Sequence, residues 1–358
     1  MNGTLPVLPS DYDALSDFLA GFPGETNPRS FWLDRFALWW DRNPAFRAGA
    51  ERGWLLRKDG TVVGFCGMVP SWFQRGGEET AALTATTWRV LPEFRSQSLT
   101  LFLAVLRAAR DTVIFCTTPG EATVAVLKAM KFQLLPRGDS QRSVVPIHAS
   151  RVAAAQLEDR WGGSVLAGVL ARGLDLWSAT RLRHLRHAPS GVEVRELAHA
   201  DVRFDGLWER TRGRYANTNV RRAEVINWFC FGHPGMRKTL LGAYVNDDLV
   251  GYGIFRLNAE NRFGLKVFEC LDLWPDPAEG RVLQALVRGA TEHAEAHGYD
   301  LLAVPHFSSG LASGLRELGL IQLAGRERRD YFRTEGRNAG GMTEANSYFV
   351  AAQGDDGL

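Results

Sequence analysis

The side chains best suited to chemistry in this chain lie in the turn at residues 88–100. Its sequence, WRVLPEFRSQSLT, is typical of a strand that ends in a short loop and opens directly onto a helix. A helix N-terminus directs unpaired backbone N–H groups and the positive end of the helix dipole at one spot. Arg95 adds a permanent charge, and Ser96, Ser98 and Thr100 add hydroxyl donors. These residues predict a site for a phosphate or pyrophosphate.

Three further side chains are candidates for proton transfer. Asp272 ends a predicted strand and His306 follows the neighbouring one, so adjacent strand ends can bring them together as a base and the group that orients it. The alternative is a capping aspartate and a surface histidine. Glu269 lies on the opposite strand face from Asp272 unless a bulge intervenes. Glu93, beside the first turn, is either catalytic or a solvated loop residue.

Apolar periodicity predicts the elements that position the first turn. We expect two helices, a hairpin, a long strand, a helix, a strand, a helix and a last strand. These span residues 11–19, 30–40, 54–57 with 61–69, 81–90, 99–110, 112–116, 121–130 and 132–135. Asp59-Gly60 favours a tight hairpin turn because both residues tolerate positive φ. Ser96 or Ser98 is the expected N-cap of the helix at 99–110.

A similar order of elements recurs further along the chain, which indicates an internal structural repeat. The expected elements span residues 221–231, 240–245 with 249–257, 266–273, 279–297, 301–304 and 310–318. Between the halves, apolar residues at helical spacing predict a linker helix packed on both domains. Because its end is basic, residues 163–187 carry an alternative, a peripheral contact with a membrane surface or an acidic partner.

The first turn resembles the signature of the GNAT superfamily of N-acetyltransferases. Val90-Leu91-Pro92-Glu93-Phe94-Arg95 fits its Val-x-Pro-x-x-Arg strand end, and the following residues occupy its pyrophosphate loop, with Ser98 and Thr100 where the family has glycine. The resemblance implies an α/β fold of the α+β type: two tandem GNAT-like domains, each a mixed, mostly antiparallel sheet flanked by helices. The implied divisions are an acyl-CoA-binding domain at 1–146, a helical linker at 147–191 and a second domain at 192–358.

The resemblance also implies a co-substrate, acetyl-CoA or another acyl-CoA, held by the first domain. Its pantetheine arm is expected between strand edges near Trp88 and Thr117. The cofactor-binding residues carried over are Trp88, Arg89, Val90, Arg95, Ser96, Gln97, Ser98, Leu99, Thr100 and Thr117. In the second half, Asp272, Asp276 and Glu279 fill the corresponding turn and would repel a pyrophosphate, so that half is expected to lack coenzyme A.

The function that follows from the resemblance is N-acyl transfer, with acetyl as the expected group, from acyl-CoA to the amine of a small molecule or amino-sugar. The first half lacks the Glu and Tyr that many GNAT enzymes use, although backbone N–H groups near Arg89 or Val90 can still polarise a carbonyl. Two alternatives stay open. One is a noncatalytic ligand-binding or scaffold protein, and the other is transfer from a carrier-bound or tRNA-bound donor.

Length and composition narrow the remaining classes. A chain of 358 residues favours about two domains, and a net charge of +2 provides no field for nonspecific nucleic-acid binding. The four cysteines are isolated, so we expect neither a metal site nor disulfides. We expect a soluble, cytoplasmic protein, because the sequence shows no signal-peptide pattern and no apolar run of about 18 residues that could span a membrane. The sequence leaves the oligomeric state open.

Overall fold

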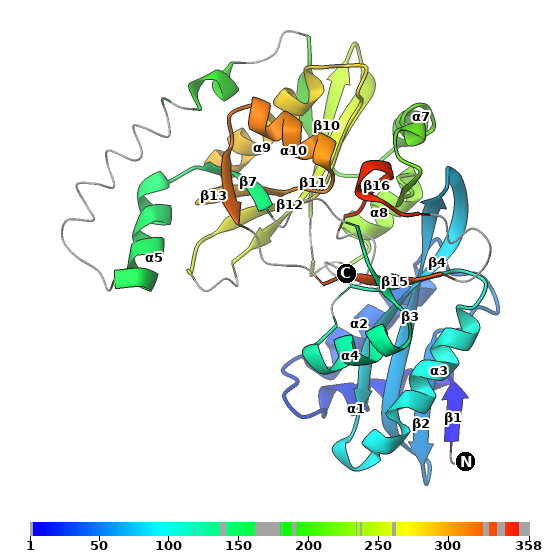
Figure 1. Ribbon diagram of the computed structural model, residues 1–358. Coiled ribbons are helices and arrows are strands. Elements are labelled where there is room, and N and C mark those ends of the chain that lie inside the picture. Colours follow the sequence, from blue (N-terminus) through cyan, green and yellow to red (C-terminus); the bar gives the residue numbers. More distant parts are fainter. Residues whose placement is uncertain are drawn as a thin grey trace.

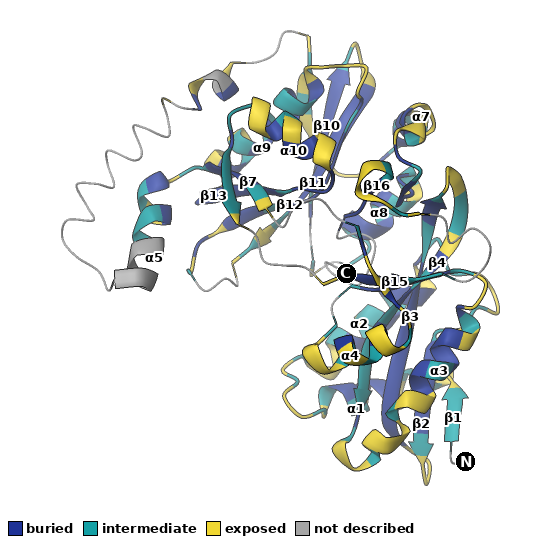
Figure 2. Ribbon diagram, viewed as in Figure 1, coloured by how far each residue is buried: buried dark blue, intermediate teal, exposed yellow. Residues whose placement is uncertain are grey.

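The computed structural model describes residues 3–117, 119–136, 141–161, 180, 182–187, 191–233, 235–236, 238–259, 263–324, 329–334 and 341–350. The described strands form two mostly antiparallel sheets, each flanked by helices (Figure 1). The predicted fold class is therefore confirmed. Both sheets are largely buried, while exposed residues lie on the outer sides of the flanking helices and in the turns and loops (Figure 2).

The first sheet has nine described strands, ordered β1-β2-β3-β4-β5-β15-β6, with β9 pairing with both β3 and β16. They are β1 (Gly3–Pro6), β2 (Gly53–Lys58), β3 (Thr61–Arg75), β4 (Glu78–Val90), β5 (Val113–Cys116), β6 (Gln133–Leu134), β9 (Asn217–Asn219), β15 (Tyr331–Arg333) and β16 (Ser347–Tyr348). The predicted hairpin is present, and its turn residues Asp59 and Gly60 have φ of +50° and +82°.

Helices cover both faces of the first sheet. They are α1 (Tyr12–Ala20), α2 (Arg29–Phe36) with a π-helical turn (Ala37–Asp41), α3 (Ser98–Ala108) and α4 (Glu121–Ala129). Phe65 of β3 packs with the α1–α2 side, whereas Met68 of the same strand packs with α3 and α4, as strand alternation requires. The sheet is thus buried on both sides.

The second sheet has seven described strands in the order β14-β7-β13-β12-β11-β10-β8. They are β7 (Gln141–Pro146), β8 (Glu193–Leu197), β10 (Thr239–Val245), β11 (Asp248–Asn258), β12 (Val267–Pro275), β13 (Leu301–Pro305) and β14 (Ile321–Ala324). The helices of this half are α7 (Val202–Thr211), α8 (Ala223–Phe231), α9 (Val282–Ala296) and α10 (Ser309–Glu317). Each predicted element of this half is present, with ends shifted by a few residues.

The two sheets exchange strands across the predicted domain boundaries. β7 comes from the predicted first domain but pairs with β13 and β14 of the second sheet. Conversely, β15 from the C-terminal region pairs with β5 and β6 of the first sheet, where Figure 1 shows it beside the N-terminal strands. A division at residue 146 therefore does not separate the two sheets. The pairing of β7 and β15 depends on contacts between segments far apart in the sequence, which local sequence patterns do not reveal.

The predicted linker at 147–191 begins with α5 (Ala149–Trp161) and ends near a 3-10 turn (Arg183–Arg186). Most of the segment predicted as a peripheral contact, residues 163–187, lies outside the described residues.

The two halves are joined by buried polar contacts. Trp228 Nε1 of α8 donates to the Leu38 carbonyl at 2.8 Å. Gln74 Nε2 of β3 donates to the carbonyls of Arg212 and Tyr215 at 2.9 and 2.6 Å. One hydrophobic cluster runs through both halves, so the first sheet and the second half share a core.

The expected N-cap of α3 is wrong. A 3-10 turn (Pro92–Gln97) runs directly into α3, the N-cap position is Gln97 with helical backbone, and it makes no side-chain capping bond. The chain is already helical when it enters α3, so the Ser98 N–H finds the Arg95 carbonyl of the preceding turn.

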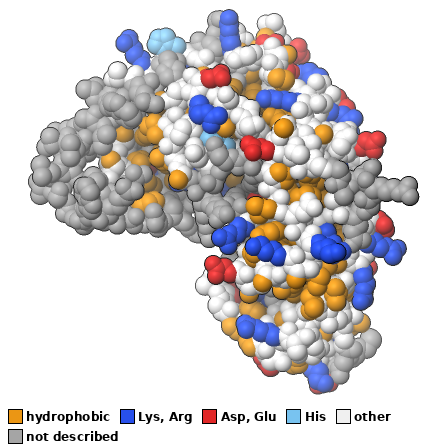
Figure 3. Space-filling view, in the orientation of Figure 1, with side chains coloured by type: hydrophobic (Ala, Val, Ile, Leu, Met, Phe, Trp, Pro, Cys, Tyr) orange, Lys and Arg blue, Asp and Glu red, His pale blue; other side chains and the backbone are white. Residues whose placement is uncertain are grey.

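Charged side chains of both signs are interspersed on the face seen in Figure 3, in keeping with the near-zero net charge. The four cysteines are buried and unpaired. Within the described ranges, no cluster of three or more His, Cys, Asp or Glu side chains could hold a metal ion. None of the described helices is both long and apolar enough to cross a membrane.

Candidate functional site

A cavity lies where β4 and β5 separate. The two strands pair in parallel over three residue pairs that end at Thr84 and Phe115. Beyond Thr84, β4 continues to Val90 paired with β3 on its other side. The resulting cavity has a volume of about 380 Å³. Its lining residues are Glu25, Asn27, Phe31, Trp32, Arg35, Cys66, Ala85, Thr86, Thr87, Trp88, Arg89, Phe102, Cys116, Thr117, Pro119, Gly120 and Thr123.

A β-bulge at Thr87 determines which side chains face which side of β4. Register with β3 runs through Thr86, skips, and resumes with Arg89, and Thr87 has a φ of +50°. An extra residue reverses the alternation of side chains that follow it. Trp88 consequently stacks on Phe102 of α3, with ring centroids 4.6 Å apart, while Arg89 faces α1 and α2.

Arg89 is held by an acid and two aromatic rings. Its Nη1 lies 2.6 Å from Oε2 of Glu25. Its guanidinium carbon lies 5.2 Å from the ring centroid of Phe22 and 5.5 Å from that of Trp32. A guanidinium held by one carboxylate and flanked by two rings has little rotational freedom. The group is therefore fixed at the cavity wall.

Glu25 is itself locked in the turn between α1 and α2. Its Oε1 accepts hydrogen bonds from the Thr26 N–H at 2.9 Å and from the Asn27 N–H and Nδ2 at 2.8 and 2.7 Å. Burial raises the pKa of Glu25, but the bonds from Asn27, Thr26 and Arg89 outweigh it and lower the pKa below its ordinary value. Glu25 is thus held as a carboxylate with only 5% of its side chain exposed.

Three of the predicted coenzyme residues, Trp88, Arg89 and Thr117, line this cavity, and Val90 is buried beside it. The sequence argument missed Glu25, whose signal was a polar stretch, Glu-Thr-Asn-Pro, between two predicted helices. The orientation of Arg89 was not predicted either, because the residue types around Thr87 do not indicate a β-bulge.

The predicted phosphate turn lies at the end of β4 and is mostly solvent-exposed. Ser98 is half-buried, and the other predicted residues of this turn are exposed, namely Glu93, Arg95, Ser96, Gln97, Leu99 and Thr100. None of them is among the described residues that line the cavity. The Phe94 and Ser98 N–H groups donate to the preceding turn, which leaves fewer backbone donors for an anion than an open loop would.

Asp272 and His306 have other partners than the predicted dyad. The Asp272 carboxylate accepts from Arg221 Nε at 2.9 Å and from the Tyr252 hydroxyl at 2.8 Å, and none of its hydrogen bonds goes to His306. His306 Nε2 shares a hydrogen bond of 2.9 Å with Ser143 Oγ of β7. A bulge at Leu271 places Glu269 and Asp272 on the same strand face, and Glu269 pairs with Arg256.

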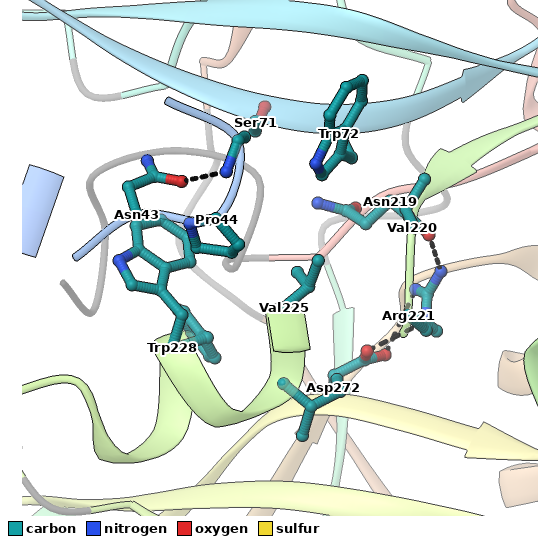
Figure 4. A pocket seen from close by; sticks show the side chains of 13 residues that line it. Asn43, Pro44, Ser71, Trp72, Asn219, Val220, Arg221, Val225, Trp228 and Asp272 are labelled. Carbon is teal, nitrogen blue, oxygen red and sulfur yellow. Dashed lines mark hydrogen bonds and ion pairs between the residues drawn. The ribbon is translucent and has the colours of Figure 1, made fainter. Parts of the chain in front are cut away.

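In the second half, β12 and β13 pair only up to Glu269 and Ala303, and further along β12 the Leu273 carbonyl accepts from the Tyr348 hydroxyl. A small cavity of about 20 Å³ lies between the two halves. It is lined by Arg221 and Asp272 together with Asn43, Ser71 and Trp72 (Figure 4).

Comparison with known proteins identifies the fold. No protein-family model matches the sequence, and a search of curated proteins found no match. Among solved structures, the chain is similar to a protein of Enterococcus faecalis described as a probable N-acyltransferase, with a TM-score of 0.60, 9% identity and coverage of 93% of this chain and 72% of that one. A GCN5-related N-acetyltransferase of Kribbella flavida matches with a TM-score of 0.59 and 12% identity, over 93% of this chain and 71% of that chain.

The N-myristoyltransferase of Saccharomyces cerevisiae, solved with bound myristoyl-CoA, is also similar. It matches with a TM-score of 0.54 and 12% identity, over 96% of this chain and 83% of that chain. Identities this low establish a shared fold and leave the activity open. The chain thus has the GCN5-related N-acetyltransferase fold, as its turn at residues 90–95 suggested.

Proposed function

We propose that this protein is an acyltransferase that moves an acyl group from acyl-CoA to the amine of a small molecule. The observation that carries the proposal is the separation of β4 from β5 beyond Thr84 and Phe115, which leaves a cavity of about 380 Å³ lined by both strands. A pantetheine arm carries amide groups that can form hydrogen bonds with strand backbone in such a gap. The similar structures, one of them with bound myristoyl-CoA, support an acyl-CoA donor.

The residues present fit this donor. Thr86, Thr87 and Thr117 line the cavity where a polar arm would pass. The exposed turn after β4 offers Arg95 and Ser96 for the phosphates. The lining combines polar side chains with the aromatic rings of Phe31, Trp32, Trp88 and Phe102, and a volume of about 380 Å³ suits the pantetheine arm with a short acyl group such as acetyl.

Acyl transfer requires few chemical steps of this site. The acceptor nitrogen attacks the thioester carbonyl carbon, the C–S bond breaks, the nitrogen gives up a proton and the coenzyme thiolate takes one. Backbone N–H groups of β4 beyond Thr84 supply donors for the developing oxyanion. Glu25 is the single carboxylate among the described lining residues, and its lowered pKa makes it a weak base. We therefore assign Glu25 a positioning role.

The other predicted catalytic residues fit structural roles better. Asp272 and His306 are 2% and 4% exposed, and their hydrogen bonds go to Arg221 and to Ser143, respectively. Glu93 is exposed at the turn outside the cavity. A noncatalytic protein that binds acyl-CoA remains the competing proposal, because the cavity lining described here contains no group with the pKa of a general base.

Titration calorimetry with coenzyme A, acetyl-CoA and a long-chain acyl-CoA tests the donor. We expect micromolar binding, tightest for acetyl-CoA, and release of free thiol when amines are added. Absence of binding by all three ligands would overturn the proposal. Binding without thiol release across a broad amine panel would instead favour the noncatalytic alternative.

A further inference from the structure

We propose that the acceptor carries a carboxylate beside its reacting amine, and that Arg89 binds this carboxylate. The inference rests on the proposed acyl transfer and names the class of its acceptor as amino acids and related amino carboxylates. It follows from the position, the unused donors and the rigidity of one guanidinium.

Arg89 has donors to spare. Of its five N–H groups, one on Nη1 is directed at Glu25, and Glu25 is its only polar partner among the described residues. The side chain is 30% exposed, and that exposure opens onto the cavity that Arg89 lines. A guanidinium with two or more free donors on one edge matches the two oxygens of a carboxylate.

The charge around Arg89 supports the same assignment. Among the described residues that line the cavity, Glu25 is the single carboxylate. Glu25 already neutralises part of the charge of Arg89 through one oxygen and is held by three hydrogen bonds through the other. An anionic group on the acceptor would bind the remaining N–H donors of Arg89, whereas an ammonium group beside them would be repelled.

The arginine is also organised before any ligand arrives. Trp32 and Phe22 flank the guanidinium, and Glu25 fixes its plane. Little side-chain entropy is therefore lost on binding, which makes a bidentate contact more favourable. Because the bulge at Thr87 directs Arg89 to the α1–α2 side and Trp88 to the α3 side, a carboxylate on Arg89 lies across β4 from the helix that follows the phosphate turn.

Matched acceptor pairs test the inference. Glycine, alanine and phenylalanine would be compared with their carboxamides in a thiol-release assay with acetyl-CoA, and aminomethylphosphonate would test a phosphonate in place of the carboxylate. For at least one pair, we expect the kcat/KM of the wild type to be about tenfold or more higher for the amino acid than for its carboxamide. The reason is that the carboxamide cannot form the charged hydrogen-bonded pair with Arg89. A preference for the carboxamides in every pair, or for the phosphonate alone, would overturn the proposal.

Variants place the effect at Arg89. For the preferred amino acid, Arg89→Gln should raise KM by about tenfold to a hundredfold with kcat changed little, and Arg89→Lys should recover part of the loss. Arg110→Gln, which removes an exposed arginine paired with Asp111, should match the wild type. Equal loss for the amino acid and its carboxamide in Arg89→Gln would assign Arg89 a general structural role and overturn the inference.

A readout without the coenzyme separates this inference from the proposed function. Calorimetric binding of the same amino acids to the protein alone should weaken in Arg89→Gln. If acyl-CoA does not bind but amino acids bind through Arg89, the donor assignment fails and the carboxylate site stands. If acyl-CoA binds and is turned over but no carboxylate is favoured, the carboxylate site fails and the acyltransferase stands.

Discussion

Arg221 and Asp272 form an ion pair in the second half, with Arg221 Nε 2.9 Å from Asp272 Oδ2 and side chains only 1% and 2% exposed. Arg221 also donates to the Thr218 hydroxyl and to the Asn219 carbonyl, at 2.7 and 2.6 Å. Its guanidinium carbon lies 3.9 Å from the Trp274 ring centroid. The pair connects the segment between β9 and α8 to β12.

Removing one member of this pair should destabilise the protein strongly, because it leaves a buried charge without its partner. We expect Arg221→Met or Asp272→Asn to lower the free energy of unfolding by about 3 to 5 kcal/mol. The double variant Arg221→Met/Asp272→Asn should lose less than the sum of the two single losses. Urea unfolding of all three variants measures the coupling, and additive losses would show that the two residues do not act as a pair.

Coenzyme binding should depend on Arg95 through the phosphates alone. Since Arg95 is exposed, Arg95→Ala should weaken coenzyme A binding by only about threefold to tenfold, and less at high salt. Pantetheine, which lacks the nucleotide phosphates, should bind wild type and variant alike. Arg110→Ala is the matched control for loss of one exposed charge. Unchanged binding of coenzyme A in Arg95→Ala would move the phosphate site away from this turn.

The sequence predicted the local elements well and the long-range pairing poorly. Asp59-Gly60 and Asn246-Asp247 lie at hairpin turns with positive φ, as their residue types indicated. The strand Tyr331–Arg333 was missed, because three residues carry no periodic signal and their pairing with β5 joins segments more than 200 residues apart.

The candidate site was predicted only in part, for a related reason. Trp88 and Thr117, which were predicted to lie beside the pantetheine arm, line the cavity, and their role in coenzyme binding stays a prediction. The role of Arg89 depends on a bulge, and the partners of Asp272 come from segments that were not expected to meet it. From sequence alone, a catalytic carboxylate at a strand end cannot be distinguished from a carboxylate that is buried in an ion pair, as Asp272 is.

Raising the pH above about 8 should increase the free energy of unfolding, because the buried Lys238 then loses its charge in the folded protein. Burial lowers the pKa of Lys238 to about 8, from 10.5, and its Nζ donates to the Phe229 carbonyl at 2.6 Å. Below pH 8 both folded and unfolded states are protonated, and the buried charge destabilises the fold in full. Between pH 8 and 10.5 the folded state releases its proton first, so stability rises with pH.

Comparison with Lys238→Met isolates this term, because other titrating groups are common to both proteins. The unfolding free energy of the wild type minus that of Lys238→Met should increase by up to roughly 3 kcal/mol from pH 7.5 to 10.5. Chemical unfolding at intervals of half a pH unit provides the measurement. A difference that stays flat over this window would show that Lys238 keeps its ordinary pKa in the fold.

The bulge at Thr87 should be required for the cavity, whereas the side chain of Thr87 should not. Thr87→Gly keeps the extra residue and suits a φ of +50°, so relief of strain and added chain entropy nearly cancel, and stability should change by no more than about 1 kcal/mol. Deletion of Thr87 restores regular alternation and turns Trp88 and Arg89 to the wrong faces. The Trp88–Phe102 stack and the Glu25–Arg89 pair would both be lost.

We therefore expect the deletion to lower the unfolding free energy by several kcal/mol and to abolish acyl-CoA binding, while Thr87→Gly, which loses one lining side chain but keeps the bulge, still binds acyl-CoA. Thermal unfolding and calorimetry on the two variants make the test, with far-ultraviolet circular dichroism to confirm that each is folded. If the deletion variant folded with unchanged melting temperature and affinity, the reversal of side-chain alternation at Thr87 could not be what positions Arg89.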